Sequence, residues 1–181
     1  KSLFRLFKDW FALGNRVVPE TNYTDPTDQR PHCSLLSLPY LFGSQLHNLP
    51  AVTPYISPPA STPENLRVPP PPGGLSVGLV WAANPENKDM YRHKSIPLQL
   101  LMPRLLDLIG LDLVDLHVLQ FGSDNSQLDP WRSHERITDW SSEINDFSDT
   151  AYVLQQLDLV ITVDTAVAHL SGALNRATWL L

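Results

Sequence analysis

The stretch VITVDTAVAHLSGAL, residues 160–174, decides the fold. It starts with the apolar and β-branched residues of a strand, passes through Asp164 and Thr165, and continues with the spacing of a helix. A nearly continuous apolar strand is typical of a parallel strand that is buried on both faces. The acid and the hydroxyl come where the first turn of a helix leaves backbone N–H groups free. The stretch therefore predicts a buried strand that ends in a polar site.

Further strand and helix patterns alternate on the N-terminal side of this stretch and after it. The predicted strands cover residues 76–82, 113–121, 136–140, 157–163 and 177–181. The predicted helices cover residues 95–110, 148–157 and 165–175. Ser95 is expected to cap the first of these helices, and Pro103 to kink or split it. The alternation favours an α/β fold with a Rossmann-like, doubly wound parallel sheet.

Prolines divide the chain into three parts. Nine of the 17 prolines lie in one stretch that ends in RVPPPPGG, and such a composition favours extended backbone over helix. We expect residues 51–75 to form a proline-rich linker or strap. It would join a short N-terminal piece, which is the tail of something rather than a complete domain, to a compact C-terminal domain, residues 76–181. Within the first part, residues 2–11 show the apolar stripe of a helix, and residues 15–20 are a candidate strand.

The composition narrows the class of protein. A net charge of −6 argues against a general binder of nucleic acid or of anionic membranes. Cys33 is the only cysteine, so an intrachain disulfide is excluded and a reducing compartment is favoured. No apolar run is long enough to span a bilayer, and no secretory signal pattern is found. We expect a cytoplasmic protein, present here as a fragment of a longer chain.

Polar side chains gather after several predicted strands, where parallel sheets bind ligands. Lys88, Arg92, His93 and Lys94 follow the first strand. Asp164 and Thr165 follow the fourth, at a helix start, which is a site suited to phosphate. His169 comes four residues after Thr165 and so projects on the same face of that helix.

Each of these residues also has a purely structural explanation that involves no ligand. Asp164 is an equally good candidate for a helix N-cap. For His169 a partly buried structural histidine is the more common role, and for the basic cluster a solvated loop. Other sites are excluded because their patterns are missing: the glycine-rich dinucleotide turn, the P-loop, zinc spacings, the nucleophile elbow and the D-x-D pair of metal-dependent glycosyltransferases.

Four segments carry a resemblance to a known family. They are GLVWAANP (78–85), HKSIPL (93–98), LQFG (119–122) and the stretch from NDFSDTAYV to ATWLL (145–181). Together they resemble the glycosyltransferase-like domain of bacterial tetratricopeptide-repeat proteins. That domain is similar to the heptosyltransferases of glycosyltransferase family 9. The resemblance covers about residues 32–181 and implies a GT-B fold, in which two Rossmann-like domains face a cleft. Residues 1–50 would then be the end of the N-terminal Rossmann-like domain, and residues 76–181 an incomplete C-terminal nucleotide-sugar-binding domain.

The resemblance also implies a function. It implies an inverting, metal-independent transfer of a sugar from a nucleotide-diphospho-sugar donor to an unknown protein or glycan acceptor, with no cofactor and no metal ligands. Lys94 matches the basic residue that offsets charge on the departing diphosphate. The remaining residues that match donor-binding positions are Asn84, Gln120, Gly122, Asp164, Thr165 and His169.

The sequence also departs from the family. Asn175 and Ala177 stand where relatives commonly have Gly and Pro, and Asn175 can replace the glycine as a left-handed helix end. The catalytic base of the family lies near the start of the first domain, outside this chain, so we expect the chain alone to be inactive or nearly so. Two alternatives stay open. One is a non-catalytic sugar-nucleotide sensor or scaffold, and the other is a nucleotide-sugar epimerase, against which the missing glycine-rich turn counts.

Overall fold

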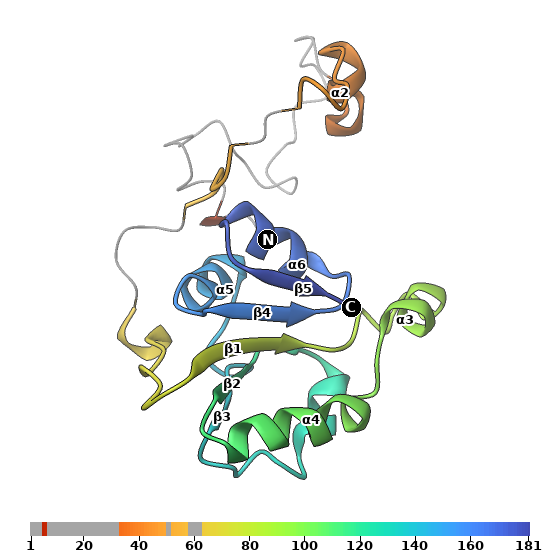
Figure 1. Cartoon of the computed structure of the whole chain (residues 1–181). Coiled ribbons are helices and arrows are strands. Elements are labelled where there is room, and N and C mark those ends of the chain that lie inside the picture. The colour runs from red at the N-terminus through yellow and green to blue at the C-terminus, as the bar shows by residue number, and fades with distance from the viewer. Residues whose placement is uncertain (1–4, 7–32, 50–51, 58–62) are drawn as a thin grey trace.

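A five-stranded, all-parallel sheet forms the centre of the computed structural model, which describes residues 5–6, 33–49, 52–57 and 63–181 (Figure 1). The strand order is β3-β2-β1-β4-β5. The strands are β1 Leu75–Val80, β2 Val114–Val118, β3 Ile137–Asp139, β4 Leu159–Thr162 and β5 Thr178–Leu180. The predicted doubly wound α/β class is confirmed, and each predicted strand is present with slightly shorter bounds.

Helices cover both faces of this sheet. The longer ones are α4 Leu98–Gly110, α5 Phe147–Leu154 and α6 Ala166–Ala173. The shorter elements are α2 Leu38–Leu41, α3 Lys88–Lys94 and the 3-10 turns η4 Leu35–Ser37, η5 Glu64–Leu66 and η6 Ser123–Leu128. Helix α4 packs on one face, and α5 and α6 pack on the other (Figure 1).

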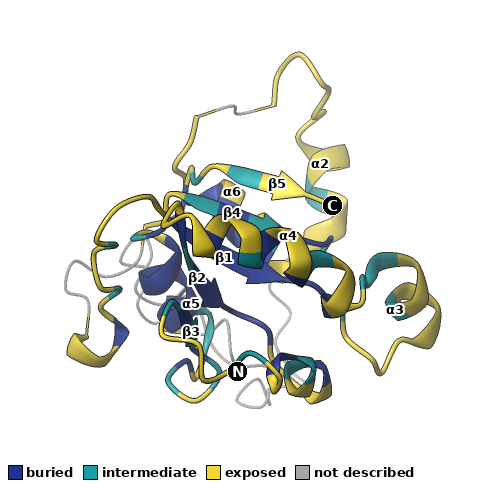
Figure 2. Ribbon diagram, turned by 60° about the horizontal axis from the view of Figure 1, so that its bottom comes forward, coloured by how far each residue is buried: buried dark blue, intermediate teal, exposed yellow. Residues whose placement is uncertain are grey.

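Two cores result from the alternation of side chains along the strands. In β1, Val77 and Leu79 join the core beneath α4, whereas Val80 joins the core beneath α5 and α6. Both cores consist of buried aliphatic and aromatic side chains, and burial of each large one stabilises the fold by about 1.5–3 kcal/mol. Figure 2 shows the central strand β1 largely buried, whereas β5 at the edge of the sheet is mostly exposed.

Segments distant in the sequence close the α5 side of the sheet. Leu6, Ile56 and Leu66 are buried in the same core as α5 and α6. The Gln156 side chain accepts a hydrogen bond from the Val68 backbone N–H and donates one to the carbonyl of Leu66. The described part of the proline-rich segment therefore packs as a strap on this domain. Of the predicted N-terminal helix, residues 5–6 are described and helical, whereas the candidate strand 15–20 lies outside the described residues.

Two local predictions were wrong around the start of α4. The segment 88–94 forms the helix α3, whose N-terminus is capped by the Asn87 side chain, rather than a loop. Ser95 ends α3 instead of starting α4, and its hydroxyl accepts a hydrogen bond from the Ala83 backbone N–H. Pro97 is the N-cap residue of α4, and Pro103 lies inside α4 without splitting it.

His117 is a titratable group inside the core beneath α5. Its side chain is 2% exposed, and its Nδ1 accepts a hydrogen bond from the Trp140 indole N–H over 3.2 Å. Burial lowers the pKa of His117 to about 4, against a smaller opposing effect of Asp115. The folded protein therefore holds a neutral imidazole at neutral pH.

We expect the free energy of unfolding to fall as pH decreases through this histidine's range. The folded pKa lies below the unfolded value of about 6.5, so the unfolded chain binds the extra proton first. The stabilisation is complete above pH 6.5 and is lost toward pH 4, by up to about 3 kcal/mol. Denaturant unfolding at several pH values measures it. His117→Asn keeps an acceptor for Trp140 and should flatten the profile; an unchanged slope in that variant would refute the assignment.

Gly74 immediately precedes β1 and adopts a conformation that suits glycine. Its φ is +91°, and a Cβ there would lie 2.3 Å from the carbonyl oxygen of Leu113. Gly74→Ala should lower the free energy of unfolding by more than about 2 kcal/mol, because backbone strain and a backbone clash add. Gly110→Ala is the control, since a Cβ at Gly110 meets nothing within 4 Å. Equal stability of the two variants would contradict the prediction.

Candidate functional site

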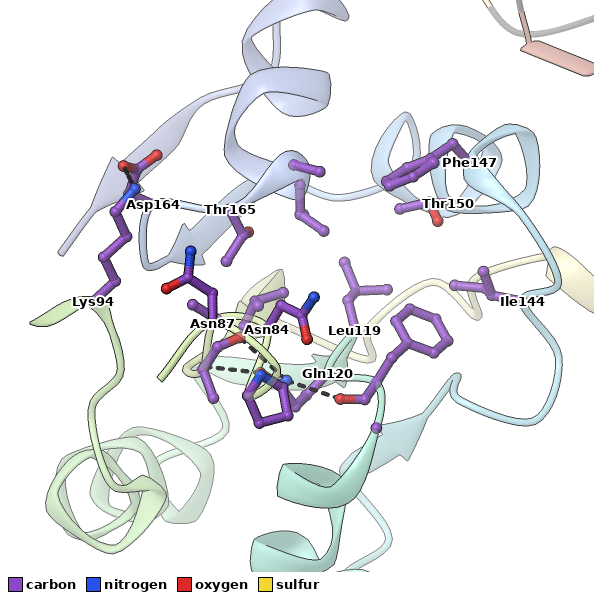
Figure 3. A pocket seen from close by; sticks show the side chains of 18 of the residues that line it. Asn84, Asn87, Lys94, Leu119, Gln120, Ile144, Phe147, Thr150, Asp164 and Thr165 are labelled. Atoms are coloured by element: carbon purple, nitrogen blue, oxygen red, sulfur yellow. Dashed lines mark hydrogen bonds and ion pairs between the residues drawn. The ribbon is translucent and has the colours of Figure 1, made fainter. Parts of the chain in front are cut away.

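The pocket lies where the strand order reverses. The chain builds β1, β2 and β3 toward one edge of the sheet and then returns to place β4 on the other side of β1. Loops that leave neighbouring strands in opposite directions open a crevice at their carboxyl ends. A cavity of about 730 Å³ lies in this crevice. Its walls come from the turn after β1, α3, the end of β2, and the first turns of α5 and α6 (Figure 3).

The fold brings together six of the seven predicted site residues. They are Asn84, Lys94, Gln120, Gly122, Asp164 and Thr165, and all of them line the cavity. His169 is not among the lining residues. Its side chain is 82% exposed, with Nε2 lying 3.7 Å from an Asp164 oxygen.

An ion pair stands at one end of the cavity. The Lys94 ammonium donates to the Asp164 carboxylate over 2.5 Å, although the two residues are 70 positions apart in the chain (Figure 3). The hydrogen bond and the charge of Lys94 lower the pKa of Asp164. Both groups are partly exposed, so an entering anion can reach the ammonium.

Beside this ion pair, helix α6 begins without a side-chain cap. Its N-cap residue is Thr165, and the Thr165 side chain makes no capping hydrogen bond. Asp164 is therefore not the N-cap of α6. Its carboxylate instead accepts a hydrogen bond from Lys94. Ala166 and Val167, in the first turn of α6, line the cavity. Such a helix start carries partial positive charge and N–H donors for an anion.

Gln120 lies beneath the cavity and holds its floor together. The side chain is 4% exposed, and its Oε1 accepts from the backbone N–H groups of Trp81 and Ala82. Its Nε2 donates to the carbonyls of Ala82 and Phe121. These bonds occupy the amide, so Gln120 acts on the pocket by fixing the turn that follows β1.

An apolar wall, which the sequence reasoning missed, faces the ion pair across the cavity. Leu119, Ile144 and Phe147 form it together with Val80 (Figure 3). The signal in the sequence was weak, because Ile144 and Phe147 lie between two predicted elements with no periodic pattern of their own. The cavity thus has a charged end and an apolar end.

In residues 5–6, 33–49, 52–57 and 63–181, no group of three His, Cys, Asp or Glu side chains could hold a metal ion. Over these same residues, no helix combines the length and the apolar character needed to cross a membrane.

Replacement of Gln120 should destabilise the domain. Gln120→Leu removes four hydrogen bonds to backbone groups, most of them buried, and should lower the free energy of unfolding by about 2–4 kcal/mol. Denaturant unfolding measures the loss. The matched control is Gln99→Leu at an exposed position of α4, where little change is expected. The role assigned to Gln120 fails if both variants unfold at the same denaturant concentration.

Comparison with known proteins finds limited structural similarity. No family model and no curated protein sequence matches the chain. Among solved structures, the chain is similar to E. coli heptosyltransferase WaaC with ADP-2-deoxy-2-fluoro heptose, at 17% identity and a TM-score of 0.46. It is also similar to the same enzyme with ADP, at 16% identity and a TM-score of 0.45. Each match covers 62% of this chain and 33% of the other, so the chain matches about a third of those proteins. At this identity and overlap, the likeness assigns no activity or residue role to this chain.

Proposed function

We propose that the cavity binds a nucleotide-diphospho-sugar and that the chain is part of a GT-B glycosyltransferase. The reaction would be a metal-independent, inverting sugar transfer, in a cytoplasmic bacterial protein whose other segments include tetratricopeptide repeats. One observation carries the proposal. A cavity at the strand-order reversal sets a lysine ammonium and an uncapped helix N-terminus opposite an apolar wall.

The charged end suits a diphosphate. Lys94 supplies a full positive charge, and the first turn of α6 supplies backbone N–H donors beside it. The Thr165 hydroxyl adds a further donor at this end. During transfer, negative charge builds up on the departing nucleoside diphosphate, and preorganised donors that face it lower the barrier. Lys94 is thus the proposed catalytic residue.

The Asp164 carboxylate has a different part in this proposal. It repels a phosphate but holds the Lys94 ammonium in the cavity through the 2.5 Å hydrogen bond. A carboxylate can also accept hydrogen bonds from sugar hydroxyls. We therefore assign Asp164 to the sugar side of the donor and Lys94 to the diphosphate.

The apolar end suits the nucleobase. Leu119, Ile144 and Phe147 offer a surface for a flat heterocycle, while Asn84 lies near the polar half of the cavity (Figure 3). The volume of about 730 Å³ falls within the usual range of about 300–1,000 Å³ for small-molecule sites. A donor with both a base and a charged linker uses both ends, which a free sugar or inorganic phosphate would not.

A second function is donor binding without catalysis, because the carboxylates that line the cavity supply no general base and an enzyme would need one from outside this chain. The carboxylates that line the cavity, Asp146 and Asp164, are both engaged. Asp146 caps α5 and pairs with Arg5, and Lys94 lowers the pKa of Asp164. A carboxylate with a lowered pKa is a weak general base at neutral pH. A sensor or scaffold domain would need no base.

Calorimetric titration with ADP, UDP and GDP and with their sugar conjugates tests the proposal. We expect the compounds of one nucleobase to bind, with the same affinity in the presence and absence of Mg²⁺. Lys94→Ala should weaken binding of the diphosphate and of its sugar conjugate by about 10–100-fold, because a charged hydrogen bond is lost. Asp164→Ala should weaken the sugar conjugate more than the free diphosphate, since it also removes a repulsive charge.

Each control variant removes a charge of the same sign as the variant it is compared with, but outside the cavity. Arg104 and Asp107 form an exposed ion pair on α4, and Arg104→Ala and Asp107→Ala should leave the affinities unchanged. The proposal fails if the folded wild-type chain and its longer parent bind none of these compounds. Release of the diphosphate from the donor by the parent protein, measured over time, distinguishes the enzyme from the non-catalytic alternative.

A further inference from the structure

Helix α3 presents Lys94 to the cavity but has little packing of its own. None of its residues is buried, and it stands beside the domain rather than on a face of the sheet (Figures 1 and 2). Its following residues, Ser95 and Ile96, hydrogen-bond to the turn after β1. Within the helix, the side chains of Tyr91 and Lys94 form hydrogen bonds to the rest of the domain. Something other than burial must therefore set the orientation of this helix.

Tyr91 provides such an anchor. Its hydroxyl donates to the Asp124 carboxylate over 2.5 Å, and its ring packs against the core beneath α4. The hydrogen bond to Asp124 is the main cause of a raised pKa of the Tyr91 hydroxyl. The tyrosine is one helical turn before Lys94, so fixing the Tyr91 side chain fixes the direction in which Lys94 leaves the helix.

Asp124 is itself held from a second side. It is 7% exposed, in η6, and the oxygen that accepts from Tyr91 also accepts from the Gln127 amide over 2.7 Å. Gln127 in turn accepts a hydrogen bond from the Leu98 backbone N–H, at the start of α4. Among the described residues, no cation lies within ion-pair distance of Asp124. Burial of a carboxylate without a cation is costly unless hydrogen bonds replace its hydration. The bonds from Tyr91 and Gln127 do so, and they also join α3 to the start of α4.

We propose that Tyr91 is a positioning residue whose hydrogen bond to Asp124 orients α3 so that Lys94 reaches the diphosphate end of the cavity. The importance for donor binding rests on the proposed function. The placement of Lys94 itself does not, and it can be measured without any nucleotide.

The first experiment measures the reactivity of the Lys94 amine. The folded chain is treated with a small amine-acylating reagent, and the rates at Lys94 and Lys88 are followed by mass spectrometry. Tyr91→Phe keeps the ring and removes the hydroxyl; we expect it to speed acylation of Lys94 several-fold and to leave Lys88, on the same helix, unchanged. Asp124→Leu should act like Tyr91→Phe, whereas Asp124→Asn keeps an acceptor and should restore a rate near that of the wild type.

Two controls separate positioning from general instability. Tyr40→Phe, on the exposed helix α2, should leave both rates unchanged. Amide hydrogen exchange should become faster in α3 of Tyr91→Phe but stay the same in β1, β2 and β4. An unchanged Lys94 rate in both Tyr91→Phe and Asp124→Leu would overturn the proposal, as would equal acceleration of Lys94 and Lys88.

The second experiment is a double-mutant cycle on nucleotide affinity. With Lys94 present, Tyr91→Phe should weaken binding by about five-fold, the effect of one lost hydrogen bond. In a Lys94→Ala background, the same change should have no effect, because Tyr91 acts through Lys94. An equal loss in both backgrounds would show that Tyr91 acts independently of Lys94. If the wild-type chain binds no nucleotide, the proposed function fails, while the acylation rates still decide whether Tyr91 positions Lys94.

Discussion

The parallel pairing of β1 with both β2 and β4 is the constraint on which the rest of the structure depends. It places the carboxyl ends of three strands at one edge of the sheet, and the reversal of strand order opens a crevice there. The pairing needs close packing beneath it. At Gly78, in the middle of β1, a Cβ would lie 2.6 Å from a Leu157 methyl group, so the backbone and the core approach more closely than a larger residue would permit.

The electrostatics of the site follow from this edge. The chain as a whole carries a net charge of −6, yet the cavity combines a lysine with the positive end of a helix. The ion pair between Lys94 and Asp164 is partly exposed, so it contributes little to stability, and its main effect is to place the ammonium. A local cation in an acidic protein suits a small anion better than a polyanion.

Segments from the N-terminal part of the chain complete the domain. Arg5 pairs with Asp146 and Asp149 at the start of α5, and Leu6 is buried in the core beneath that helix. The Asp149 carboxylate also accepts from the Asn145 backbone N–H, and its pKa is lowered chiefly through that bond and Arg5, against the effect of its own burial. The segment that carries Ile144 and Phe147, two residues of the apolar wall, is thereby linked to residues more than 100 positions away.

The sequence by itself determined the class of fold and the place of the site. Apolar runs such as that ending at Val163 require burial on both faces, and alternation with helices leaves a parallel sheet as the solution. The position of Asp164 and Thr165 after such a strand placed them at the carboxyl end of the sheet, where the structure has the cavity. Hydrophobic periodicity could not predict α3, because this short helix has no buried residue and therefore no apolar stripe.

Only the tertiary structure decided which polar residues meet. The local sequence made Asp164 a candidate N-cap of α6, but in the folded chain its carboxylate accepts a hydrogen bond from Lys94. Gln120 resembled a ligand contact, yet the neighbouring strand end occupies its amide. His169 shares a helix face with Thr165 but extends into solvent outside the cavity. These outcomes depend on distances between segments far apart in the chain, which local sequence preference does not encode.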